Sequence, residues 1–382
     1  MKKILSAAAI TFAFTAFASA FTWSGLIDNS TSLSTSDFKK FGLNQSNGIY
    51  LSMGSALSAS GNVRFATEGM YKYNLNVADL DKGKSNFTNI ADLTLLKLYG
   101  TWAAGNGSFE LNAGRFSYSD LSSVVFSQAS DGLNLAYDTS DFRIGCYAGY
   151  TGLLNSLNVS MTDAGKTSNK QFYNLCAGYI PLSLDLSYKT LFDSNVIGLQ
   201  GVYFLKTDDK LTDKFYVTLS LSGPISTIGS YSIKGTVGSE KFENVMLYGA
   251  ADFSAYLSSA LVVTTGAEYA SGNNFDGNVK SFKTITSSSA CKMGGGIPLS
   301  GVFTPKLSAM LVYGKFYGNL TEKVVFAVPG NEMKSQGSDT SCSLIFNVLS
   351  DVQIATDISA YVDFNKKEYN YYSATLRASL AF

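Results

Sequence analysis

The chain ends with the stretch YYSATLRASLAF, residues 371–382, and this stretch decides the fold class. Its even-numbered side chains, from Tyr372 to Phe382, are all apolar or aromatic, whereas most of the odd-numbered ones are polar and include Arg377. Successive side chains of a β-strand point to opposite faces. The alternation therefore predicts a strand with one apolar face and one polar face.

The same alternation recurs upstream in segments of about ten residues. In 182–188, Leu and Tyr at the even positions alternate with Ser and Asp at the odd ones, and residues 227–238 and 352–365 follow the same design. Gly, Asn, Asp and Ser separate the segments, and a helical period is almost absent. The chain is therefore predicted to be all-β.

Composition excludes several classes of function. The 382 residues contain no His and only 15% charged residues, although 13% are aromatic and 35 are Gly. Without His there is no Ser-His-Asp triad, no His-ligated metal and no ordinary proton shuttle near neutral pH, so we predict no enzyme, no cofactor and no metal site. The formal net charge of zero gives no reason to expect nucleic acid as a partner.

The first twenty residues indicate export. A basic pair, Lys2-Lys3, precedes an apolar stretch, and the small residues ASA at 18–20 are typical of a signal-peptide cleavage site. We predict a signal peptide at 1–20 and a single domain at 21–382. After Phe21 no apolar run approaches the roughly 20 residues of a transmembrane helix.

Connections between the segments alternate between long and short, as in outer-membrane barrels. Long ones are predicted at 29–47, 76–90, 117–132, 152–170, 271–283 and 317–340, and short ones at 58–61, 104–107, 139–141, 258–259, 298–304 and 350–351. With 171–190 taken as one strand containing Pro181, and Gly294–Gly296 inside another, the pattern gives about 18 strands. Splitting or merging the weakest pairs gives about 14 or 16 instead.

Alternation alone is also typical of a soluble β-sandwich, so the membrane assignment depends on further features. One polar face on so many strands, with charges of both signs, exceeds what a sandwich of this size exposes. Aromatic residues gather near segment ends, for example at Tyr71, Tyr188 and Tyr313, as in interfacial girdles. Strands in lipid must also close, because unpaired backbone groups are costly there. We predict a transmembrane, antiparallel, up-and-down β-barrel.

These features resemble the porin-type outer-membrane β-barrel proteins of double-membraned bacteria. The resemblance rests on the leader, the alternation of connections and the terminal strand ending at Phe382. It implies an outer-membrane location in contact with lipid, and an assembly machinery that recognises Phe382. It is compatible with a homo-trimer or a monomer.

The polar faces of the segments supply candidate pore-lining residues. These are Arg64, Glu68, Lys72, Glu110, Asn112, Asp185, Lys189, Lys234, Asp252, Glu268, Asp357 and Arg377. Facing charges of opposite sign would set up a transverse field that orients and filters polar solutes. The alternative is that these charges solvate the inner wall and hold strand register through salt bridges.

The region 113–132 is similar to the part of porins where a loop folds into the pore. Two interpretations of the loop 117–132 stay open: an ordinary extracellular loop, or a constriction that brings Asp120 to the solutes. Arg115 alternates with apolar residues, so a place at the outer membrane interface is an alternative to the pore for its side chain.

Four cysteines are spread along the chain without a CxxC motif. Cys146 and Cys176 are predicted on the same face of consecutive strands, where they either form a disulfide or contact lipid as small apolar residues. Cys291 and Cys342 are separated by a whole strand and are not expected to pair.

Two functions from different classes fit these predictions. The first is a channel for passive diffusion of small polar solutes or ions through a weakly charge-selective lumen. The second is a surface adhesin or structural protein, whose barrel only displays the loops 29–47, 152–170, 271–283 and 317–340. A fatty-acid transporter would need an apolar lumen, and an outer-membrane hydrolase generally uses the missing histidine.

Overall fold

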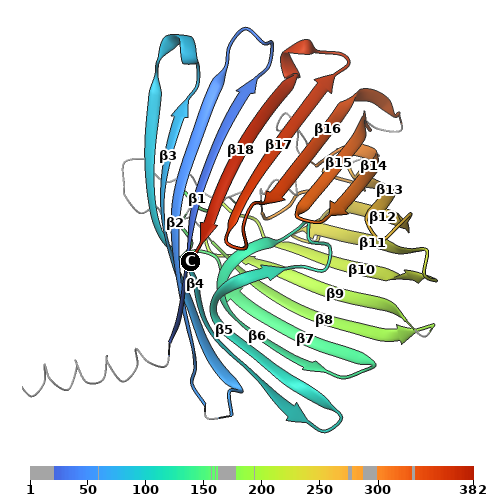
Figure 1. The fold of residues 1–382 in the computed structure, drawn as a ribbon. Helices are drawn as coiled ribbons and strands as arrows, with labels where there is room; N and C mark the ends of the chain where they lie inside the picture. The colour runs from blue at the N-terminus through green and yellow to red at the C-terminus, as the bar shows by residue number, and fades with distance from the viewer. Residues whose placement is uncertain are drawn as a thin grey trace, which may run out of the picture.

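A computed structural model describes residues 21–58, 60–155, 157–159, 161, 178–192, 194–273, 278–286, 299–328 and 332–382. Within these residues, eighteen strands form one antiparallel sheet in sequence order (Figure 1). The first nine are β1 Thr22–Thr35, β2 Gly42–Ala56, β3 Val63–Val77, β4 Ser85–Ala104, β5 Gly107–Ser119, β6 Ser127–Asp138, β7 Phe142–Tyr150, β8 Tyr179–Leu191 and β9 Asn195–Lys206. The others are β10 Lys214–Ile225, β11 Gly229–Glu240, β12 Met246–Tyr256, β13 Leu261–Ala270, β14 Val302–Tyr313, β15 Phe316–Ala327, β16 Lys334–Asn347, β17 Val352–Asp363 and β18 Tyr371–Ala381.

The sheet closes because the first and last strands pair. β1 and β18 are antiparallel from Leu26 opposite Ala381 to Thr35 opposite Tyr372, and Gly25 and Phe382 exchange two backbone hydrogen bonds at the end of the ladder. Closure satisfies the backbone groups that an open edge would expose. The all-β, up-and-down barrel predicted from the alternation is confirmed.

Two short 3-10 helices, η1 Leu80–Lys82 and η4 Lys367–Tyr369, lie in the connections β3–β4 and β17–β18. None of the helical segments in the described part of the chain is long and apolar enough to span a membrane.

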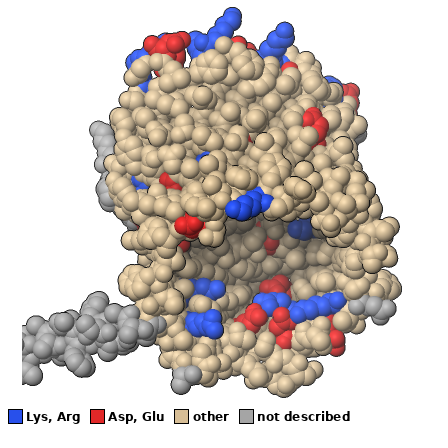
Figure 2. Space-filling model, viewed as in Figure 1, with Lys and Arg blue, Asp and Glu red and all other residues tan. Residues whose placement is uncertain are grey.

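The two faces of the sheet differ as the alternation requires. The outer face carries exposed apolar side chains such as Leu184, Leu219 and Leu376. Figure 2 shows a broad uncharged outer surface, a rim where charged side chains gather, and a hollow whose wall carries charges of both signs. The uncharged surface is the kind that a hydrocarbon layer accepts.

Several predicted connections are too long. Residues 29–35 and 42–47 extend β1 and β2, so the connection predicted at 29–47 shrinks to 36–41. Residues 85–90 likewise belong to β4, and 127–132 to β6. These stretches are rich in Ser and Asn and polar on both faces, so they do not alternate, yet their backbone pairing continues beyond the apolar part of the wall.

The predicted number of strands agrees with the structure because two errors in the prediction cancel. Residues 317–340, predicted as a long loop, contain most of β15 and the start of β16, joined to β14 by a tight turn at Gly314, whose φ is +57°. The segment between Ala270 and Val302, predicted to contain a strand, contains none among its described residues, and the turn predicted at 298–304 overlaps β14. Gly294–Gly296 lie outside the described residues.

The strand predicted at 171–190 begins only at Tyr179 in the described chain. Pro181 does lie inside it, opposite Phe204 of β9. On its other side, the β7 pairing starts one residue later, at Leu182 opposite Ala148. Pro181 therefore takes no part in the pairing with β7, so its missing N–H leaves no hydrogen bond unmade there. This explains how a proline is tolerated inside the strand.

Candidate functional site

Three connecting segments lie inside the barrel. Residues 120–126 follow β5, the described residues of 151–161 (151–155, 157–159 and 161) follow β7, and 278–286 belong to the connection between β13 and β14. They meet through backbone bonds from Ile285 and Thr286 to the carbonyl of Val125, and through a bridge between Met161 and Thr286. Their apolar side chains form a buried cluster with inward residues of β8–β10, including Phe126 and Phe204. The described connections after β5, β7 and β13 thus narrow the interior.

The segment 120–126 is held by the carboxylate of Asp120. One carboxylate oxygen accepts the backbone N–H of Phe126 at 2.7 Å, and the other accepts both the backbone N–H (2.9 Å) and the hydroxyl of Ser122. Asp120 is buried. Burial raises the pKa of Asp120 above its ordinary value, although these hydrogen bonds and the charge of Lys234 act in the opposite direction.

Side chains of the wall anchor the same segment from β9 and β11. The amide oxygen of Gln200 on β9 accepts the backbone N–H of Leu121 at 2.6 Å, and Lys234 on β11 donates to the carbonyl of Ser122 at 3.5 Å. Gln200 also donates to the hydroxyl of Tyr118 at 3.1 Å. The segment 120–126, which joins β5 to β6, is therefore held by side chains of the more distant strands β9 and β11.

The wall is interrupted between β4 and β5. β4 pairs with β3 up to Ser85, but with β5 only from Leu96 to Ala104. On the N-terminal side of Leu96, the edge of β4 meets the segment 151–161 instead. Asn155 Nδ2 of this segment donates to the carbonyl of Ala91 on β4 at 3.5 Å. This connection takes the place that the upper part of β5 would otherwise occupy.

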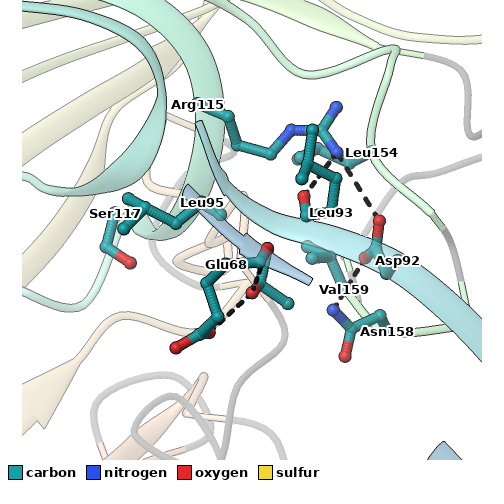
Figure 3. A pocket seen from close by; sticks show the side chains of 11 residues that line it. Glu68, Asp92, Leu93, Leu95, Arg115, Ser117, Leu154, Asn158 and Val159 are labelled. Atoms are coloured by element: carbon teal, nitrogen blue, oxygen red, sulfur yellow. Dashed lines mark hydrogen bonds and ion pairs between the residues drawn. The ribbon is translucent and has the colours of Figure 1, made fainter. Parts of the chain in front are cut away.

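Arg115 lies at this interruption. Its guanidinium donates to both carboxylate oxygens of Asp131 at 2.9 Å, and it also donates to the carbonyls of Leu93 and Leu153, both at 2.9 Å. The carboxylate of Asp92 lies 3.5 Å away and accepts a hydrogen bond from Asn158 at 2.8 Å (Figure 3). Arg115 is only 7% exposed, so the interfacial position considered for its side chain is wrong.

A cavity of about 320 Å³ lies beside the Arg115 network (Figure 3). The carboxylate of Glu68 faces it and accepts hydrogen bonds from the hydroxyls of Ser52 at 2.9 Å and Thr94 at 2.6 Å. Leu95, Leu154 and other apolar side chains complete the lining. The cavity therefore has a mixed wall, in which the carboxylates of Glu68 and Asp92 and the guanidinium of Arg115 stand among apolar side chains.

The structure brings three groups of candidate pore-lining residues together in ion pairs. Arg143 bridges Glu110 (2.8 Å) and Asp138 (3.1 Å), and Asp138 also binds Lys189. A second group joins Asp252 and Glu268 through Lys306, at 2.8 and 3.5 Å, and a third joins Arg377 to Asp357 at 2.7 Å. These three groups supply the salt bridges of the alternative interpretation, in which the charges hold strand register.

The remaining candidate pore-lining residues lie apart from these three ion-pair groups. Arg64 lies at the β2–β3 turn, where it donates to the carbonyl of Gly61 at 3.2 Å. Lys72 stands opposite Gly48, Asn112 opposite Asn134, and Asp185 opposite Gly145.

Two further predictions concern the ends of the chain and its cysteines. Phe382 is exposed beside Gly25 of β1. Cys146 is exposed on the outer face of β7, whereas Cys176 lies outside the described residues, as do Cys291 and the leader 1–20. Among the described side chains, no cluster of three or more Cys, Asp or Glu could hold a metal ion.

Sequence reasoning missed the partners of Arg115 and of the inward segments. Arg115 and Asp131 carry opposite charge and stand opposite each other in the β5–β6 hairpin. The predicted loop 117–132 contained Asp131, so this cross-strand pair was missed. No local signal exists for Asp92, Asn158 or Gln200, because segments far apart in sequence bring them to the site.

Comparisons with known proteins find the fold but no close sequence relative. No protein-family model matches the chain, and no curated protein matches its sequence. The fold is similar to three proteins of Pseudomonas aeruginosa. OccK5 (OpdH) has a TM-score of 0.64 at 13% identity, over 95% of this chain and 98% of OccK5. OccK2 (OpdF), in complex with glucuronate, gives 0.62 at 13% over 95% and 98%. The outer membrane protein OprD gives 0.59 at 12% over 95% and 93%. The resemblance to porin-type barrels is thereby confirmed for the fold.

Proposed function

We propose that the protein is an outer-membrane channel through which small polar solutes diffuse passively. The observation that carries this proposal is a closed barrel whose outer face is apolar, whose inner face carries charges of both signs, and whose interior is narrowed by 120–126, 151–161 and 278–286. An apolar exterior suits lipid, and a charged interior suits hydrated solutes.

The proposal includes the export route and the solute class. The segment 1–20 would act as a cleaved signal peptide, and Phe382 would be recognised by the assembly machinery. OccK2, solved with glucuronate, shares the fold, and a small polar solute of comparable size is the class we propose here. Acids and bases both line the wall, so the charge selectivity would be weak.

Display of adhesive loops is the weaker candidate. Two of the four connections that such a function would present, 29–47 and 317–340, consist largely of strand residues. In the other two, 152–170 and 271–283, the described residues Leu154, Met161 and Phe282 belong to the buried cluster inside the barrel. An adhesin would need these residues at the surface.

Reconstitution into a planar bilayer tests the channel. We expect stepwise, ohmic conductance from the purified protein. A protein that inserts and resists protease, yet never conducts, would contradict the proposal.

Charge reversal tests the pore-lining assignment. Lys234→Glu combined with Arg377→Glu should shift the reversal potential in a salt gradient toward cation preference, because both positions are on the inner face. Lys82→Glu, an exposed position in η1 of the β3–β4 connection, is the matched control and should shift it little. An unchanged reversal potential in the double variant would contradict the assignment.

A further inference from the structure

β15 carries an acidic side chain on the outer face of the barrel. Glu322 stands opposite Leu307 of β14 and opposite Thr340 of β16. Leu307 is 56% exposed on the outer face, and Leu320, two positions before Glu322 on the same strand, is 51% exposed. Register partners and alternate residues of a strand share a face, so Glu322 points outward.

The position of Glu322 along the strand places it within the apolar belt. On β15 the aromatic side chains of Phe316 and Phe326 lie on either side of it, toward the two ends of the strand. Phe326 contacts Phe303 of β14 at a ring distance of 6.3 Å. Aromatic residues mark the two interfaces of a membrane barrel. A carboxylate between them faces hydrocarbon, where an ionised group is costly.

The chain itself solvates this carboxylate only in part. The hydroxyls of Ser338 and Thr340, both on β16, donate to its two oxygens. A carboxylate can accept about four hydrogen bonds. With these two hydrogen bonds Glu322 keeps acceptor capacity, and lipid tails offer no donor to fill it.

The surface around Glu322 is suited to close contact with another protein. Among leucines and isoleucines, several outward positions nearby are small or carry hydroxyls: Gly318 on β15, Cys342 on β16, and Thr356 and Ala360 on β17. Small residues let two backbones approach in a membrane, and hydroxyl groups supply hydrogen bonds across the contact. We call the outward residues of β15–β17 around Glu322 the Glu322 face.

We propose that the Glu322 face packs against the same face of a second copy of this chain. This inference rests on the proposed membrane location. The face contains an acceptor with spare capacity and also donors, among them Thr356, so it is complementary to itself, as an isologous contact requires. In such a contact Glu322 of one copy accepts hydrogen bonds from hydroxyls of the other copy, and both carboxylates leave the lipid.

Two native cysteines provide the test. Cys342 lies in the Glu322 face, and Cys146 lies on the outer face of β7, far along the sheet and opposite the exposed Leu184. In a background with Cys176 and Cys291 replaced by Ser, one protein keeps only Cys342 and another only Cys146. Both are reconstituted in liposomes and oxidised with copper-phenanthroline.

We expect disulfide-linked dimers from the Cys342 protein at about tenfold the yield from the Cys146 protein, although Cys146 is the more exposed thiol. Glu322→Leu should lower the Cys342 yield several-fold without unfolding the barrel, because it removes a charge from the belt. Leu184→Ala is the matched control on the other outer face and should leave the yield unchanged.

Equal, low yields from both cysteines together with a monomeric mass by light scattering in mild detergent would overturn the proposal. An unchanged dimer yield in Glu322→Leu, or a cross-linked product containing a different protein, would also overturn it. Single-channel conductance of the same samples separates this inference from the proposed function. Dimers without conductance would contradict the channel alone, and conductance from a monomer would contradict the contact alone.

Discussion

Over β8–β11 the outer face of the barrel carries mainly large apolar side chains with glycines between them, whereas over β15–β17 it also carries hydroxyl groups and the carboxylate of Glu322. Leu184, Leu199, Leu219 and Ile233 represent the first region, and each is about half exposed or more. In the second region Glu322 and Thr340 stand opposite each other among exposed leucines. Lipid accepts the first surface fully, and the second only if its polar groups find partners.

The inner faces of the same two regions differ as well. β9 and β11 hold the segment 120–126 through Gln200 and Lys234. β17 and β18 carry the Asp357–Arg377 pair, which is partly exposed. The alternation rule therefore assigns each residue to a face, but what covers that face depends on the connections.

The largest effect is expected from a charge on the apolar outer face. Ile233→Arg on β11 should lower the free energy of unfolding in lipid by about 2–4 kcal/mol, because the guanidinium would face hydrocarbon. Its neighbour in sequence, Ser232, faces inward opposite Asp252, so Ser232→Arg should cost much less. Urea unfolding in lipid vesicles, followed by tryptophan fluorescence, measures both.

A charge placed on the outer face of β15–β17 allows the two outer regions to be compared directly. Thr340→Arg places a guanidinium opposite Glu322, where a cross-strand ion pair offsets part of the cost. We expect a smaller loss of stability than for Ile233→Arg. Equal losses at the two outer positions would show that the two surfaces meet the same environment and would contradict the comparison.

The sequence predicted the barrel well because its signal is local. Period-two alternation in 182–188, 227–238 and 371–382 depends only on neighbouring residues, and strand pairing turns it into an apolar outside and a polar inside. Closure and the number of strands followed from the same repeats, although the strand number was helped by two compensating errors around 271–340.

Strand ends and the interior were predicted poorly because their signals are not local. Residues 42–47 and 85–90 are paired strands without an apolar face, so periodicity could not separate them from loops. The position of 120–126 inside the barrel depends on Gln200, Lys234 and Ile285, which are distant in sequence. The sequence pointed to Asp120 and Lys234 separately but gave no sign that they act on the same segment, and only the contacts of Asp120 with Ser122 and Phe126 are local.

A middle-sized effect is expected where the β8–β11 region holds its inward segment. Asp120→Ala leaves the buried N–H groups of Ser122 and Phe126 without their acceptor, which should weaken the anchoring by about 1–3 kcal/mol. Release of the segment should increase open-channel current noise and mean conductance. Asp120→Asn keeps one acceptor oxygen and should show a smaller change. Unaltered noise in Asp120→Ala would show that other contacts hold the segment.

The pH dependence of the same segment follows from the burial of Asp120. Because its pKa is raised in the anchored state, that state holds the proton more tightly than a released one. Lowering the pH through the raised pKa toward the ordinary value of Asp should therefore stabilise the anchored segment, and raising the pH should loosen it. Current noise in the wild-type channel should fall with acidification, whereas Asp120→Asn should flatten the profile. A wild-type profile as flat as that of Asp120→Asn would contradict this coupling.

The smallest effect is expected inside the β15–β18 region. Arg377→Gln removes the ion pair with Asp357, but both side chains are more than a third exposed, so water screens the pair. Such pairs contribute about 0–1 kcal/mol, and unfolding in urea should change by no more than that. The reversal potential should respond more clearly, because the freed carboxylate of Asp357 attracts cations to the lumen. A stability loss as large as that of Ile233→Arg would mean that this pair is shielded from water. The inner face of β17 and β18 would then be covered by an inward segment, as 120–126 covers β9 and β11.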